Sequence, residues 1–300
     1  MGKFETMAIP PERVSIIGTI NEIKGIALGV MNATQGRLIK FPEEFTFLLS
    51  TERVVRNIQS IEPLVNGGIH LHKQGLGLLS RTILTDFITI AYSVYFSDRP
   101  NLRSSLYKIY ASDKTTIDSH MRRSKEFGIV SQQEHDNYFK AASEINGIPK
   151  QVDDYYQGKK LPRFPSLGDI ADKVPKEDPT GSEIKAAYEQ WFLHSKFEHM
   201  GYLTFVLTRK VEDDIIEFRL RLALYYAFRT LQISLEMLDK EEAWKKTSTI
   251  LARWLSDIDA HPLKPYTPSN RRRACPRSWT TTLRFGFGLI YMDRRAQGHW

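Results

Sequence analysis

A long apolar segment between residues 69 and 97 constrains the fold of this chain more than any other feature. The spacing of its apolar side chains predicts one helix that ends before Asp98-Arg99-Pro100. Two sides of that helix are apolar: one carries Leu79, Ile83, Phe87, Ile90 and Val94, and the other carries Leu84, Ile88, Ala91 and Tyr95. Because both sides need to be covered, we expect this helix at the centre of a helical domain.

The rest of the chain up to residue 260 also has helical spacing, which predicts an all-α fold, a multi-helix bundle. We divide the chain into an N-terminal extension (1–40), a helical domain (41–260) and a tail (261–300). The domain contains one proline-rich loop, residues 156–180, within which residues 167–174 could form one or two helical turns. Further helices are predicted over residues 41–61, 101–111, 114–127, 131–147, 182–208, 213–238 and 240–258.

Local sequence signals predict where two helices begin, and one segment near the N-terminus could form a strand. Pro42 with Glu43 and Glu44 is typical of a first helical turn, and Ser131 with Glu134 has the form of a capping box. Residues 14–30 could form a strand, which could pair with the apolar run at 285–292.

Charge is distributed unevenly along the chain. Eight of the 42 Lys and Arg residues, but one of the 35 Asp and Glu residues, follow residue 260, so the first 260 residues hold 34 of each sign. The net charge of +7 therefore belongs to a basic C-terminal tail. The tail is either a loosely docked extension or a nucleic-acid-binding arm that uses Arg271, Arg272, Arg273 and Arg277.

Several compartments are disfavoured. Met1–Pro11 contains Glu5 and two prolines where a signal peptide needs an apolar core, and the single cysteine, Cys275, cannot form an internal disulfide. Arg81 and Asp86 interrupt the apolar run at 76–96, which excludes the roughly 18 uncharged residues of a membrane helix. We expect a cytoplasmic protein with no membrane partner.

Arg81 and Asp86 form the first candidate for chemistry, on the polar stripe of the central helix with Thr85, Thr89 and Ser93. A buried guanidinium needs a partner, because an uncompensated ion costs several kcal/mol. Since Arg81 and Asp86 lie about 140° apart around a helix, we expect each to pair with a residue of another helix. The stripe is either part of a catalytic cluster or a polar seam that fixes helix register.

Ser195 and His199 form the second candidate, one helical turn apart on a stripe with Tyr188, Phe192 and Tyr202. His199 is either a general base or a core histidine held by one hydrogen bond. His194 and Glu198 share another face, but the repeated Glu and Glu-x-x-His pairs of helical metal sites do not occur in this chain. The sequence therefore predicts no metal and no cofactor.

Ser80-Arg81-Thr82-Ile83-Leu84-Thr85-Asp86 and Leu193-His194-Ser195-Lys196-Phe197-Glu198-His199 together resemble a bacterial all-helical family. That family is similar in outline to the HEPN-type helical bundles of defence and toxin proteins, and the resemblance covers roughly residues 41–240. It implies a metal-independent ribonuclease with an Arg-x4–6-His motif, a spacing that only Arg294 and His299 have here.

Two classes of function stay open. In the first, the protein is an interaction or regulatory module, of a mobile-element or defence locus, with an unknown protein partner. In the second, Arg81, Asp86, Ser195 and His199 line the cleft of a nuclease or other hydrolase, where His199 is the base and Arg81 neutralises a phosphate or carboxylate. A homodimer is also open, although no sustained heptad supports one.

Overall fold

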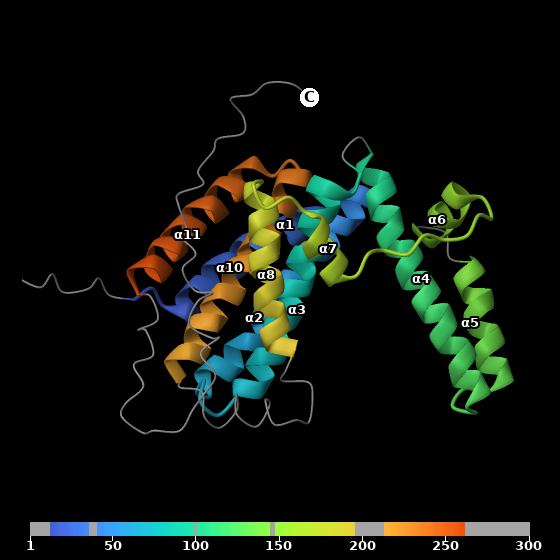
Figure 1. The fold of residues 1–300 in the computed structure, drawn as a ribbon, viewed down its shortest axis with the longest axis horizontal. Helices are drawn as coiled ribbons and strands as arrows, with labels where there is room; N and C mark the ends of the chain where they lie inside the picture. The colour runs from blue at the N-terminus through green and yellow to red at the C-terminus, as the bar shows by residue number, and fades with distance from the viewer. Residues whose placement is uncertain (1–12, 36–40, 99–100, 145–147, 196–212, 262–300) are drawn as a thin grey trace, which may run out of the picture.

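The computed structural model describes residues 13–35, 41–98, 101–144, 148–195 and 213–261, and this part of the chain contains helices and no strand (Figure 1). The predicted all-α fold is confirmed. A π-helical turn, η1 (Ser93–Ser97), extends the third helix. The α-helices are α1 (Ile16–Thr34), α2 (Pro42–Asn66), α3 (Lys73–Tyr92), α4 (Leu102–Glu126), α5 (Gln132–Glu144), α6 (Ile148–Tyr156), α7 (Leu167–Lys173), α8 (Pro179–His194), α10 (Asp213–Met237) and α11 (Glu241–Ala260).

Of the segment predicted as the central helix, residues 73–97 form α3 and η1, whereas residues 69–72 lie in the turn before α3. Helix α3 packs against α2, α7, α8 and α10. Helix α10 is buried almost all round and also contacts α2 and α11. The core between these helices contains Phe47, Phe87, Phe228 and Trp254, each fully enclosed. Two neighbouring helices, α3 and α10, therefore share the central position that the sequence assigned to one.

The N-terminal region is a correction to the sequence-based interpretation. The strand left open for residues 14–30 does not form, since residues 16–30 belong to α1, and the helical body begins at Ile16 rather than at residue 41. The Ser15 side chain caps the helix by accepting from the Gly18 N–H at 3.1 Å. Ile20, Ile23 and Ala27, spaced three and four residues apart, are fully buried where α1 meets α2 and α11.

Local signals elsewhere are confirmed. Pro42 stands in the first turn of α2 with Glu43 and Glu44, and the capping box before α5 is present, because Ser131 and Glu134 each accept from the other's backbone N–H. Residues 167–173 form α7 inside the proline-rich loop.

Two helices are longer than predicted. The segments predicted as separate helices at 101–111 and 114–127 form one continuous helix, α4, and α2 continues through Pro63 to Asn66.

Helices α4, α5 and α6 form an arm that projects from the bundle (Figure 1). The arm has a small apolar core of its own, made by Tyr107, Ala111 and Val152. No helix in the described part of the chain is both long and apolar enough to cross a membrane. The basic tail with its arginines and the apolar run at 285–292 lie outside the described residues.

Candidate functional site

Arg81 lies against α8. Its guanidinium carbon is 4.8 Å from the centre of the Trp191 ring, a cation–π geometry. The Trp191 Nε1–H donates to Thr85 Oγ1 at 3.0 Å, and the Thr85 hydroxyl donates to the Arg81 carbonyl, also at 3.0 Å. Trp191 in turn stacks on Tyr188, with ring centres 5.7 Å apart. The first half of the polar stripe thus fixes the position of α8 on α3, as a polar seam would.

Asp86 lies against α2. Arg53 donates to its carboxylate through Nη2 at 2.7 Å and Nε at 3.1 Å, and Asn57 Nδ2 donates at 3.2 Å. Burial raises the pKa of Asp86, and the hydrogen bonds from Arg53 and Asn57 only partly oppose this. Arg81 and Asp86 each contact another helix, as predicted, but these helices are α8 and α2. The structure does not bring the two side chains together.

The second candidate pair is described only in part. Ser195 follows the last turn of α8, and its hydroxyl donates to the Phe192 carbonyl at 2.6 Å. His199 and Glu198 lie outside the described residues. His194, one residue before Ser195, is 3% exposed, and burial together with the charge of Arg219 lowers its pKa to about 3. The imidazole of His194 is therefore neutral at physiological pH.

A polar network between α8, α10 and α11 was not predicted. Arg229 donates to Glu183 through Nε at 3.0 Å and Nη2 at 2.9 Å, and the Tyr225 hydroxyl donates to the same carboxylate. Gln232 accepts from Arg229 and donates to Ser248 Oγ at 2.7 Å. Each member is satisfied by another, so this network holds helices together. The available signal was Arg229, a charged residue that directly follows the apolar run 222–228.

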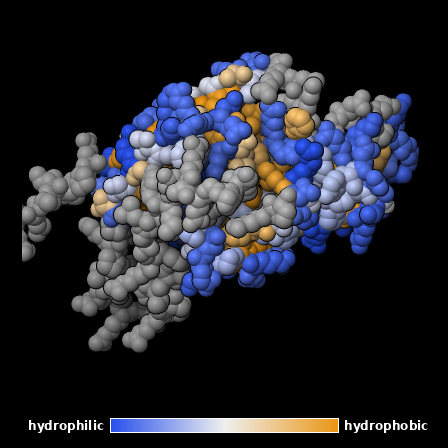
Figure 2. Space-filling model, turned by 90° about the horizontal axis from the view of Figure 1, so that it is seen from above, coloured by the Kyte–Doolittle hydropathy of each residue, from blue (hydrophilic) through white to orange (hydrophobic). Residues whose placement is uncertain are grey.

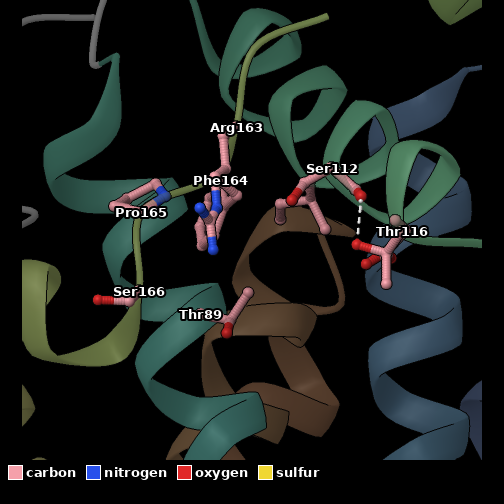
Figure 3. Close-up of a pocket in the computed structure, with 9 residues that line it drawn as sticks. Thr89, Ser112, Thr116, Arg163, Phe164, Pro165 and Ser166 are labelled. Atoms are coloured by element: carbon pink, nitrogen blue, oxygen red, sulfur yellow. Dashed lines mark hydrogen bonds between the residues drawn. The ribbon is translucent and has the colours of Figure 1, made fainter. Parts of the chain in front are cut away.

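Two adjoining cavities, of about 270 Å³ and 570 Å³, share Arg163, Phe164, Pro165 and Ser166 in their walls. We call them together the 163–166 groove. The smaller cavity is completed by Thr89, Ile109, Ser112, Asp113 and Thr116, and the larger by Tyr92, Ser97, Lys108, Pro162, Asp169 and Lys173. Figure 3 shows Arg163 and Phe164 between Ser112 and Thr116 on one side and Pro165 and Ser166 on the other, with Thr89 below them.

The local sequence explains the shape of this groove. Pro162 and Pro165 fix their own φ angles, and each favours an extended conformation of the residue before it. The chain accordingly runs without helix from residue 160 to 166, where the Ser166 side chain caps α7 in a capping box with Asp169. Sequence reasoning identified this stretch as a surface loop and did not identify a binding site in it.

No three His, Cys, Asp or Glu side chains of the described residues lie together so that they could hold a metal ion. Comparison of the chain with protein families, with curated proteins and with solved structures found no match.

Proposed function

We propose that this protein is a non-catalytic helical interaction module and that the arm formed by α4, α5 and α6 carries its binding surface. The observation behind the proposal is the tip of the arm, where Phe127 is 75% and Ile129 is 74% exposed. These are the two most exposed large apolar side chains among the described residues. The face of the arm that Figure 2 shows is mainly hydrophilic. An apolar patch within a polar surface is typical of a protein-binding site.

The tip has a defined conformation. Gly128 has a φ of 69°, and its N–H donates to the Lys125 carbonyl at 3.0 Å, while the Ile129 N–H donates to the Ser124 carbonyl at 2.9 Å. This is the Schellman arrangement that ends a helix, in which the residue in the place of Ile129 usually packs on an apolar residue of the last turn. Ser124 stands there instead, so Ile129 stays exposed on a structured turn.

Charge indicates the kind of partner. Arg122, Arg123 and Lys125 are exposed on the last turns of α4, next to Phe127. Glu126 is the single carboxylate among residues 122–129. The surface that fits this tip is an apolar pocket with carboxylates on its rim.

The contacts of the polar stripe support the non-catalytic part of the proposal. The Arg81 guanidinium lies on the Trp191 ring. The Asp86 carboxylate accepts hydrogen bonds from Arg53 and Asn57, and the Ser195 hydroxyl donates to the Phe192 carbonyl. A general base or a phosphate-binding arginine needs its polar atoms directed at a substrate.

Photo-crosslinking in cells tests the binding surface. A photoreactive phenylalanine analogue is placed at position 127 or 129 of the full chain, and at Leu71, which is 69% exposed on the body, as the control. We expect one discrete protein adduct from the two tip positions and none from position 71. The adduct should disappear when Arg122, Arg123 and Lys125 are replaced by Glu. Equal adducts from all three positions, or none from the tip, would overturn the proposal.

An activity assay tests the catalytic alternative. Purified wild-type protein and the His199→Ala variant are incubated with total RNA and with single-stranded DNA, and their thermal melts are compared. We expect no cleavage by either protein. Cleavage by the wild type that is lost in a variant with an unchanged melt would establish a nuclease instead.

A further inference from the structure

The larger cavity of the 163–166 groove collects positive charge from three different parts of the fold. Lys108 comes from α4, Arg163 from the extended segment and Lys173 from the last turn of α7. Arg163 and Lys173 form no ion pair with any residue that the structure describes, and Lys108 Nζ is 3.9 Å from Asp98 Oδ2, at the limit of an ion pair. Asp169 is the one carboxylate among the residues that line this cavity, so the wall carries more positive than negative charge, which favours an anionic ligand.

The carboxylate in this cavity, Asp169, is already engaged. It accepts from the Ser166 backbone N–H at 3.1 Å and from the Ser166 hydroxyl at 2.7 Å. These hydrogen bonds lower its pKa, and the nearby charges of Lys173 and Arg163 lower it further. Asp169 therefore serves the start of α7, and its charge neutralises at most one of the three cations. The Tyr92 phenol, whose pKa is raised by burial, and the Ser97 hydroxyl add neutral donors to the same wall.

The smaller cavity is lined by residues with hydroxyl groups and by one carboxylate, in addition to the shared residues 163–166. The Thr89 and Ser112 hydroxyls and the Asp113 carboxylate line it, together with the apolar side chain of Ile109. Burial raises the pKa of Asp113, and the charge of Arg53 opposes this. Hydroxyls with one carboxylate acceptor are the groups that hold the hydroxyls of a sugar. Phe164, shared by both cavities, contacts Tyr92 edge to face with ring centres 6.0 Å apart.

We propose that the 163–166 groove binds a small sugar phosphate, with its phosphate among Lys108, Arg163 and Lys173 and its sugar hydroxyls at Thr89, Ser112 and Asp113. The larger cavity, of about 570 Å³, falls within the range of small-molecule sites, and the smaller one adjoins it. The shared chemistry, a phosphate on a ribose-like sugar, occurs in free sugar phosphates and in mononucleotides. Because Pro162 and Pro165 restrict the backbone around Arg163, the binding surface is formed before the ligand arrives.

The position of the groove implies a role in the geometry of the arm. Lys108 belongs to α4, the base of the arm, whereas Lys173 belongs to α7, which packs on α3 and α8 of the body. The first part of α4 already packs on the body through Leu106, and a ligand held by both lysines would add a link between α4 and α7.

Calorimetric titration of the full-length protein with ribose 5-phosphate, adenosine monophosphate, ribose, adenosine and inorganic phosphate tests the proposal. We expect ribose 5-phosphate and adenosine monophosphate to bind at least about tenfold more tightly than the three compounds that lack either sugar or phosphate. Tighter binding of adenosine monophosphate than of ribose 5-phosphate identifies a nucleotide, and equal or weaker binding identifies a free sugar phosphate. Equal binding of inorganic phosphate and ribose 5-phosphate, or no binding of any compound, would overturn the proposal.

Variants locate the site. Arg163→Gln and Lys173→Gln should each weaken binding about tenfold or more, because each removes one charged contact to the phosphate. Asp113→Asn should weaken binding of ribose 5-phosphate and leave binding of inorganic phosphate unchanged. Lys160→Gln is the matched control, an exposed lysine of the same segment that does not line either cavity. An equal loss in Lys160→Gln and Arg163→Gln would indicate attraction to a basic surface and contradict the site.

Discussion

Arg221 Nη1 lies 2.8 Å from Asp257 Oδ2, and the two side chains are 7% and 3% exposed, so α10 and α11 are joined by an enclosed ion pair. The same guanidinium donates to the Val14 carbonyl at 3.0 Å and to Glu217 at 2.9 Å, and lies 5.0 Å from the centre of the Trp254 ring. Asp257 accepts from the Val14 N–H at 2.8 Å. One ion pair therefore holds the start of α1 against two later helices.

Removal of one partner of this pair should destabilise the protein strongly. Arg221→Met leaves the Asp257 carboxylate buried without its cation, and we expect the free energy of unfolding to fall by about 3–5 kcal/mol. Urea denaturation followed by tryptophan fluorescence measures this. Arg56→Ala is the control, since Arg56 is 74% exposed in its pair with Glu52, and should cost less than about 1 kcal/mol. Equal losses in the two variants would contradict the structural role of Arg221.

His194 should make stability depend on pH. Its pKa is about 3 in the folded protein and 6.5 ordinarily, so below pH 6.5 the unfolded chain takes up a proton that the folded protein does not. The contribution is complete above pH 6.5 and is lost as the pH falls toward 3, by about 1.4 kcal/mol per pH unit. In denaturation curves, the free energy of unfolding of the wild type, relative to that of His194→Gln, should therefore fall by about 1.4 kcal/mol per pH unit across this range. Parallel curves would show that the imidazole titrates normally.

The Trp191–Thr85 hydrogen bond should couple α8 to α3. In a double-mutant cycle of Trp191→Phe and Thr85→Val, we expect a coupling free energy of about 1 kcal/mol, because the bond is partly buried. Thr82→Val in place of Thr85→Val is the control, since the Thr82 hydroxyl donates to the Leu78 carbonyl of its own helix. A coupling no larger than that of the control pair would mean that the bond does not contribute to stability.

Gly181 should not tolerate a side chain. A Cβ atom added there would collide with the backbone carbonyl oxygen of Pro175, which has to shift. We expect Gly181→Ala to lower the free energy of unfolding by about 1–3 kcal/mol. Gly25→Ala is the matched control, because a Cβ at this exposed position in α1 meets nothing within 4 Å, and should raise stability by about 0.5–1 kcal/mol. Thermal melts measure both changes, and stabilisation by Gly181→Ala would contradict the packing of this turn.

Features that depend on a few neighbouring residues could be predicted. The capping box of Ser131 and Glu134 and the boundaries of α10 follow from local hydrogen bonding and from the spacing of apolar residues. The expectation that Arg81 and Asp86 would contact different helices also follows from helix geometry, since five residues turn the helix by about 140°. The central position of α3 follows from its two apolar sides.

Which side chain contacts Arg81 and which contacts Asp86 could not be predicted from the sequence. Asp86 pairs with Arg53, which is 33 residues away, and Arg81 lies on Trp191, because the packing of α2 and α8 brings those side chains to α3. Helical spacing specifies which face of α3 each residue occupies but not which helix covers that face. The same limit applies to the 163–166 groove, whose cations come from α4, the extended segment and α7.

The sequence by itself determined that the chain is helical, roughly where most helices begin, and which of their faces are apolar, because these properties arise from interactions within a few turns. Tertiary structure alone decided that residues 16–34 form a helix of the core, since a short apolar run fits a helix or a strand until its neighbours are present. It also decided which charges pair and which remain facing a cavity, because these depend on contacts between helices that are distant in the chain.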